Sequence, residues 1–301
     1  MNKIKLSLTT LALLTTFTAC GTGPELTPEM QKEMRHFDSV SQLNQFSQEL
    51  HKGMNQDELL FYAPISIEKA KDFYEEAQEA ELKDEKMVNY LNAKKSLENA
   101  YETKKLVLKY LADVIDIDKR MQKQNTKAIF PDRYSEFQDD FKELRETIDE
   151  GKASEALEDK KEVMEEAKDL YGDAVVYRNI NKAKQILENM EDEDLDELAP
   201  QHFQQAQELY EQARLQIKKE PDNQELIERV SKRANEAALY AHTIAKDIFN
   251  FRELSKDEQE AYFAKLHRKL AKLNSKEDEN AILPLPIYEK IDYLQDLYKG
   301  K

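Results

Sequence analysis

Apolar residues recur along most of this chain at alternating spacings of three and four positions, a pattern typical of helices that pack along one another. The pattern is clearest after Pro64 and Pro200. In both places a large apolar residue, an alanine, a tyrosine and a second alanine follow the proline at the same offsets. These positions are Ile67, Ala70, Tyr74 and Ala77 in the first place, and Phe203, Ala206, Tyr210 and Ala213 in the second.

A weaker copy of this pattern starts at Pro131. Its apolar positions are Tyr134, Phe137, Phe141 and Leu144. The three prolines are 67 and 69 residues apart. We interpret this as an internal repeat with a period of about 68 residues, which indicates an architecture but not an activity.

The pattern predicts two helices in each repeat. The first has about 18–20 residues and the second about 35–40, which gives lengths of roughly 30 Å and 55 Å. Because a short helix cannot cover a long one, the next short helix is expected to cover the rest. The predicted fold is therefore all-α, an elongated array of antiparallel helical repeats that form spectrin-like overlapping three-helix bundles. A tetratricopeptide array is disfavoured, because no second turn divides each repeat.

The rest of the chain is divided by turn and capping signals. Thr27-Pro28 predicts the start of an N-terminal helix that runs to about Lys52, within a segment 28–58. The repeats are expected at 59–129, 130–194 and 195–254, and C-terminal helices at 255–301. Gly151 is expected to mark a turn. Capping boxes are expected at Asp222 with Glu225 and at Ser255 with Glu258.

Composition supports long helices and limits the partners. The 301 residues include only 6 glycines and 8 prolines, and the net charge is −16. Nucleic acid is not an expected partner, since binding it requires clustered lysine and arginine. An acidic surface is interpreted as a means of staying soluble, in preference to a site for a cationic partner.

The N-terminus reads as a targeting signal. A basic start, Met1 to Lys5, precedes an apolar stretch from Leu6 to Phe17 that is too short to span a bilayer comfortably. Ala19-Cys20 follows, and Cys20 is the single cysteine of the chain. This arrangement resembles the lipobox of bacterial lipoproteins, although Phe17 stands where leucine is usual. An ordinary secretion signal with an incidental cysteine is the alternative.

The resemblance implies cleavage between Ala19 and Cys20, which removes residues 1–19 and leaves Cys20 with acyl chains such as palmitate. Residues 20–27 would then form the lipidated start and a short tether. Gly21 follows the cysteine instead of aspartate, which in Gram-negative lipoproteins implies sorting to the outer membrane. The expected location is the outer membrane, with the chain facing the periplasm.

The repeat also resembles an uncharacterised helical repeat of Gram-negative outer-membrane lipoproteins. The resemblance covers roughly Phe61–Val107 and Leu198–Phe251. Some members of that family carry an OmpA-like peptidoglycan-binding domain after the repeat. This sequence ends without one, so peptidoglycan binding is not implied here.

A search for catalytic and metal-binding motifs nominates no residue. The histidines His36, His51, His202, His242 and His267 show no metal-binding spacing, and no phosphate-binding loop or nucleophile elbow occurs. We therefore predict no metal and no cofactor. The acidic run 191–197 lacks the calcium-binding EF-hand spacing and is interpreted as a solvated linker.

Three hypotheses follow for the function. The preferred one is a non-enzymatic, lipid-anchored scaffold or adaptor that binds an envelope protein. The second is a lipid- or glycan-binding lipoprotein, which a cavity lined by Tyr74, Phe141 and Tyr210 would support. The third is an enzyme that uses two buried, close carboxylates, as some glycan-cleaving enzymes do.

Overall fold

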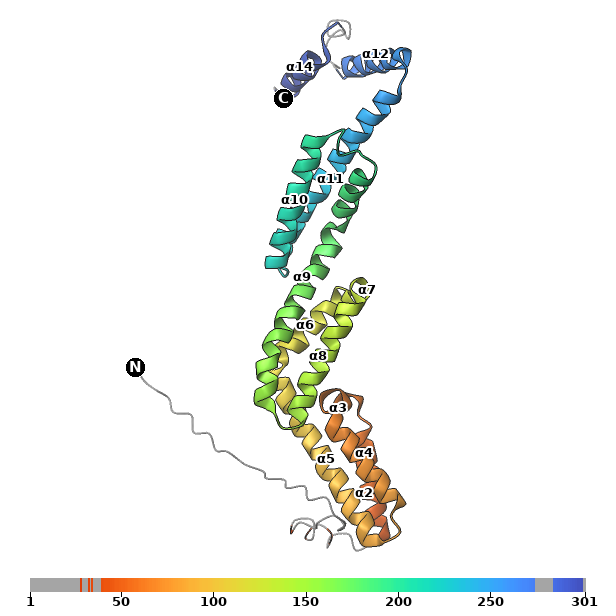
Figure 1. Cartoon of the computed structure of the whole chain (residues 1–301), viewed down its shortest axis with the longest axis vertical. Coiled ribbons are helices and arrows are strands. Elements are labelled where there is room, and N and C mark those ends of the chain that lie inside the picture. Colours follow the sequence, from red (N-terminus) through yellow and green to blue (C-terminus); the bar gives the residue numbers. More distant parts are fainter. Residues whose placement is uncertain (1–27, 29–31, 33, 35–38, 274–283, 300–301) are drawn as a thin grey trace, which may run out of the picture. The chain divides into compact units, whose positions relative to one another are not determined.

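The computed structural model describes residues 28, 32, 34, 39–273 and 284–299. These residues form helices and no strand, so the all-α prediction is confirmed (Figure 1). In chain order the helices are α2 (Val40–Met54), α3 (Asp57–Tyr62), α4 (Pro64–Glu79), α5 (Lys83–Tyr110), α6 (Ala112–Lys123), α7 (Thr126–Ile129), α8 (Pro131–Asp149), α9 (Ala153–Asp192), α10 (Pro200–Lys219), α11 (Gln224–Glu253), α12 (Lys256–Lys272) and α14 (Ile287–Lys299). The period of about 68 residues and the spectrin-like overlap stay predictions.

The chain divides into two compact units. Unit 1 combines 1–113 with 139–162, and unit 2 combines 114–138 with 163–301. The boundaries fall within α6, α8 and α9, so each of these three helices contributes residues to both units.

The three motif prolines each stand first in a helix. Pro64 begins α4, Pro131 begins α8 and Pro200 begins α10. The residue before each proline has nearly the same backbone conformation. Its φ and ψ are −140° and 64° at Ala63, −132° and 67° at Phe130, and −135° and 54° at Ala199. Proline restricts its predecessor to non-helical conformations and fits the first helical turn, which accounts for this shared geometry.

The core of unit 1 lies between α4 and α5, with α2 and α3 packed against them (Figure 1). Alanines at the contact allow the two long helices to approach closely. Ala70, Ala77, Ala93 and Ala100 are all fully buried there.

The core of unit 2 between α10 and α11 has the same character (Figure 1). Its fully buried alanines are Ala206, Ala238, Ala241 and Ala245. Residues from the end of α9, among them Leu187 and Met190, complete this core.

Three helices end in left-handed residues. Gly151 has φ +84°, and the N–H of the next residue, Lys152, donates to the carbonyl of Thr147. Asp194 has φ +53°, and Leu195 N–H donates to Met190 in the same way. Both are Schellman motifs, which satisfy the last carbonyls of a helix. At Asn125, with φ +58°, the hydroxyl of Thr126 takes this role and donates to the Met121 carbonyl at 2.8 Å.

The prediction of one long second helix in the first repeat was wrong. The helix is interrupted at Leu111, which separates α5 from α6. No glycine or proline stands near this position, and the Leu111 side chain is fully buried. No helix-breaking residue therefore accounts for the interruption.

Two predicted helix starts differ in the structure. A capping box at Ser39 and Gln42 starts α2, so the predicted helix from Pro28 to Lys52 is divided at Ser39. Asn223, not Asp222, caps α11, because the Asp222 carboxylate is engaged by other helices. The capping box at Ser255 and Glu258 is confirmed.

The acidic run 191–197 is not a fully solvated linker. Its Leu195 is buried at 2% exposure in the core of unit 2. The Schellman motif at Asp194 turns the chain so that this leucine packs inward, and the acidic neighbours of Leu195 are left outside.

We predict that Gly151→Ala lowers the free energy of unfolding by about 1 kcal/mol. A Cβ at Gly151 meets nothing within 4 Å, so the cost comes from the left-handed backbone alone. Gly172→Ala is the matched control in the middle of α9, where a Cβ makes an ordinary 3.6 Å contact with Lys218. It should stabilise the protein by about 0.5–1 kcal/mol. Urea unfolding followed by circular dichroism measures both, and equal effects of the two substitutions would contradict the assignment.

Candidate functional site

The repeat-defining residues lie on the inward sides of their helices. Fully or largely buried are Ala70, Ala77, Tyr134, Phe141, Ala206 and Ala213. Tyr74, Phe203 and Tyr210 are half-buried and pack against the cores of their units. Ala19 and Cys20, the residues of the expected cleavage and lipidation, lie outside the described residues.

The three aromatic residues expected to line a ligand cavity differ in their surroundings. Phe141 is fully buried. The Tyr210 ring packs within the core of unit 2, and burial raises the pKa of its hydroxyl. Tyr74 does line an open cavity of about 450 Å³, where its hydroxyl lies 3.0 Å from the Ser47 hydroxyl. That cavity carries charges of both signs, from Lys71, Glu75 and Glu79.

The half-buried carboxylate of Asp149 in unit 1 satisfies a helix start. Asp149 accepts hydrogen bonds from the backbone N–H of Ser66 at 2.8 Å and from its hydroxyl at 2.5 Å. The Thr103 hydroxyl donates to it as well, at 2.9 Å. Ser66 is the third residue of α4, so Asp149 satisfies a backbone donor that the helix itself leaves open. This role is structural.

Arg145, also in unit 1, satisfies a backbone carbonyl in the last turn of α3. The Arg145 guanidinium donates to the carbonyl of Phe61 and lies 4.0 Å from the centre of the Phe61 ring. It also lies 4.7 Å from the centre of the Phe141 ring. Arg145 therefore joins α8 to the last turn of α3 through one hydrogen bond and one cation–π contact, while the contact with Phe141 lies within α8.

The buried carboxylate of unit 2 is Asp118, at 7% exposure. It accepts hydrogen bonds at 2.8 Å from the Tyr134 hydroxyl and from the side-chain amides of Gln122 and Gln138. Burial and this hydrogen bond raise the pKa of Tyr134 to about 12. Asp118 and Asp149 belong to different units and have no carboxylate among these partners.

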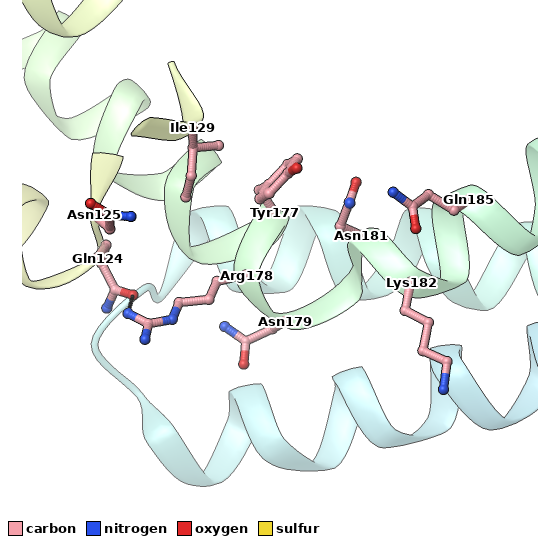
Figure 2. A pocket seen from close by; sticks show the side chains of 9 residues that line it. All are labelled: Gln124, Asn125, Ile129, Tyr177, Arg178, Asn179, Asn181, Lys182 and Gln185. Carbon is pink, nitrogen blue, oxygen red and sulfur yellow. Dashed lines mark hydrogen bonds between the residues drawn. The ribbon is translucent and has the colours of Figure 1, made fainter. Parts of the chain in front are cut away.

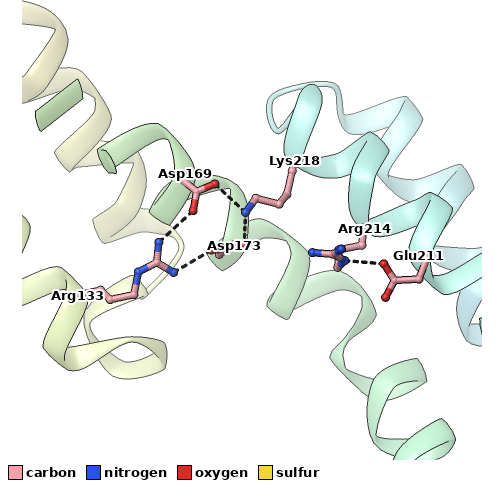
Figure 3. Close-up of polar contacts among 6 residues, drawn as sticks. All are labelled: Arg133, Asp169, Asp173, Glu211, Arg214 and Lys218. Atoms are coloured by element: carbon pink, nitrogen blue, oxygen red, sulfur yellow. Dashed lines mark hydrogen bonds and ion pairs between the residues drawn. The ribbon is translucent and has the colours of Figure 1, made fainter. Parts of the chain in front are cut away.

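An alternating charge network joins three helices of unit 2 (Figure 3). Arg133 on α8 donates to Asp173 at 2.8 Å and to Asp169 at 3.2 Å, both on α9. Lys218 on α10 lies 2.7 Å from each of the same two carboxylates. The hydrogen bond from Lys218 is the main cause that lowers the pKa of Asp169. Two cations and two anions balance here, so the network fixes helix positions and leaves no net charge for a ligand.

The turn between α10 and α11 is fixed in a similar way. Asp222 accepts a hydrogen bond from Arg120 on α6 at 2.7 Å and from the Tyr171 hydroxyl on α9 at 2.9 Å. Burial and this hydrogen bond raise the pKa of Tyr171 to about 12.

A polar cavity of about 420 Å³ opens beside α9 in unit 2 (Figure 2). The end of α6 and the short α7 provide one wall, and one face of α9 provides the other. The lining residues are Gln124, Asn125, Ile129, Tyr177, Arg178, Asn179, Asn181, Lys182 and Gln185. We call it the amide pocket, because five of these nine side chains are amides.

Sequence reasoning missed the amide pocket, although a signal for it exists. Residues 119–131 and 174–187 contain no aspartate or glutamate, in a chain with 61 of them. All nine lining residues come from these two acid-free segments. A search for local absence of acids would have nominated both.

An aromatic cluster lies where α11 meets α12. It consists of Phe251, Tyr262 and Phe263, whose ring centres are 5.2–5.8 Å apart. Tyr262 is 46% exposed and Phe263 is 44% exposed. Three aromatic rings in mutual contact with this exposure are typical of an interaction surface rather than of a core.

Within residues 39–273 and 284–299, no cluster of three histidine or acidic side chains is arranged to hold a metal ion. Across the same ranges, no helix is long and apolar enough to cross a membrane. Comparisons of the chain with protein-family models, curated proteins and solved structures give no match.

We predict that alkaline pH destabilises unit 2 through Tyr134. Its pKa is about 12 in the folded protein and near 10.0 in the unfolded chain, so folding favours the protonated hydroxyl. This contribution is present below about pH 10 and is lost as pH rises toward 12. Between about pH 9 and pH 11.5 the free energy of unfolding of the native protein should fall by about 2 kcal/mol more than that of the Tyr134→Phe variant. Urea unfolding measures both values. Parallel pH profiles for the two proteins would contradict this assignment.

Proposed function

We propose that this protein is a non-enzymatic, lipid-anchored helical scaffold or adaptor of the bacterial cell envelope. It is held at the outer membrane through Cys20 and faces the periplasm, where it binds an envelope protein. The lipobox resemblance at Ala19-Cys20 motivates the anchor and the location. Firm anchoring requires more than one acyl chain, which the lipobox chemistry would supply.

The observation that supports the adaptor role is the aromatic cluster of Phe251, Tyr262 and Phe263. Interfaces between proteins are enriched in tyrosine and phenylalanine, and their strongest contacts are aromatic residues near the centre. Tyr262 and Phe263 of this cluster are 46% and 44% exposed, so the cluster offers a partner an apolar contact that the described residues leave partly uncovered.

The packed helix interiors favour this role over a lipid carried between helices. A lipid chain needs an apolar cavity, and the fully buried Phe141 and the packed Tyr210 leave none at their positions. The open cavity at Tyr74 is lined by charged and polar side chains as well.

We predict that Cys20→Ser releases the protein from the membrane fraction. Without the thiol no acyl chain can be attached, and the described helices offer no membrane-spanning segment in its place. Fractionation of cells that express the full chain measures the effect. Recovery of the native protein in the soluble fraction would contradict the anchoring proposal.

We predict that a photo-crosslinking amino acid placed at Leu266, one helical turn beyond Tyr262 and Phe263 on α12, captures one dominant protein in cells. The double substitution Tyr262→Ser with Phe263→Ser should reduce this adduct at least about tenfold, because it removes the aromatic contacts. Mass spectrometry identifies the captured molecule.

Leu215→Ser is the matched control for the crosslinking experiment. Leu215 is 61% exposed on α10, so the substitution makes the same apolar-to-polar change away from the cluster and should leave the adduct unchanged. Capture of lipid alone, or of the same proteins from a crosslinker at the exposed Lys161 on α9, would contradict an adaptor surface at the aromatic cluster.

A further inference from the structure

We propose that the amide pocket beside α9 binds an acidic sugar, which means a hydroxyl-rich ring that carries a carboxylate. The proposal does not depend on the adaptor role, because the pocket and the aromatic cluster share no residue. It rests on the size, the charge and the hydrogen-bonding groups of the pocket.

The volume suits a small ligand. At about 420 Å³ the pocket lies within the range of about 300–1,000 Å³ that is typical of small-molecule sites. One wall comes from the end of α6 and from α7, and the other from α9 (Figure 2). A hydrogen bond across these walls, from Arg178 to the carbonyl of Lys123 at 3.0 Å, holds the walls in place.

The charge of the pocket is opposite to that of the chain. Arg178 and Lys182 line it and no carboxylate does, although the chain as a whole has a net charge of −16. Lys119, Lys123 and Lys127 lie in the acid-free segment that forms the first wall. A positive site within an acidic protein selects an anion, and an arginine or lysine donates charge-assisted hydrogen bonds to a carboxylate.

The uncharged polar side chains select hydroxyls. Among the described residues, the side chains of Asn125, Asn181 and Gln185 have no hydrogen-bond partner, and Lys182 has neither a hydrogen bond nor an ion pair. Each amide offers both a donor and an acceptor, as a sugar hydroxyl also does. Three amides that line one cavity can match several hydroxyls of one ring, whereas a bare anion such as phosphate would leave their acceptors unused.

An aromatic ring completes the site. Tyr177 lines the pocket with 44% of its surface exposed, and its ring is held edge-on against Phe130 with centres 6.0 Å apart. An exposed ring of fixed orientation can cover the apolar C–H face of a sugar while its hydroxyl stays in water. Flat apolar contact, amides and cations in one cavity form a combination that suits an acidic sugar.

Titration calorimetry of the purified full chain with glucuronic acid tests the proposal. We expect saturable binding of one equivalent, and binding weakened about tenfold or more by Lys182→Gln, since a hydrogen bond to a charged group is lost. Asn181→Ala should weaken it by about fivefold. Neither side chain has a hydrogen-bond or ion-pair partner among the residues that the structure describes, so both variants should keep the native circular dichroism spectrum and unfolding midpoint.

The matched control is Lys184→Gln, which makes the same charge change two residues further along α9. Lys184 lies outside the pocket and pairs with Glu188 at 3.3 Å, so this variant should bind as the native protein does. An equal loss in Lys184→Gln and Lys182→Gln would overturn the proposal, because it would indicate unspecific attraction.

Two further ligands test separately what the sugar ring and its carboxylate contribute to binding. Glucose should bind at least about fivefold more weakly than glucuronic acid, because it lacks the carboxylate. Inorganic phosphate should not displace glucuronic acid at equal concentration. Displacement by phosphate, equal binding of glucose, or no saturable binding of glucuronic acid would each overturn the assignment of an acidic-sugar site.

Discussion

The packing of the helices depends on a few acidic side chains at helix contacts, the buried Asp118 and the half-buried Asp149, that receive several hydrogen bonds each. Asp149 in unit 1 accepts three, from Ser66 and Thr103, and Asp118 in unit 2 accepts three from Tyr134, Gln122 and Gln138. A buried carboxylate without such donors would cost several kcal/mol. Gln122 lies on the same helix as Asp118, but the other donors come from neighbouring helices, so these hydrogen bonds link α6 to α8 and α8 to α4 and α5.

The distribution of residue types along this acidic chain makes its surface non-uniform. Where acids are absent over residues 119–131 and 174–187, two segments meet and the amide pocket forms between them. Where aromatic residues gather at the junction of α11 and α12, the surface becomes apolar. The two places differ in chemistry, which is why we assign a small acidic ligand to one and a protein partner to the other.

The helix ends show which turns can be predicted from the identity of single residues and which cannot. Gly151 was expected to mark a turn, since glycine adopts a left-handed conformation without cost, and it has φ +84°. Asn125 and Asp194 adopt the same conformation at other helix ends, but many asparagines and aspartates do not, so their identity was too weak a signal. The interruption at Leu111 has no local signal, because no glycine or proline stands near it.

The sequence by itself determined that the chain is helical and where the proline-led helices begin, because apolar spacing and the conformational limits of proline act within a few residues. The tertiary structure alone decided which helices exchange hydrogen bonds and where a cavity opens. Gln124 and Arg178, for example, are 54 positions apart in the chain and hydrogen-bonded at 3.3 Å. Such long-range contacts depend on how whole helices pack. Helix packing is set by many weak contacts that no single stretch of sequence contains.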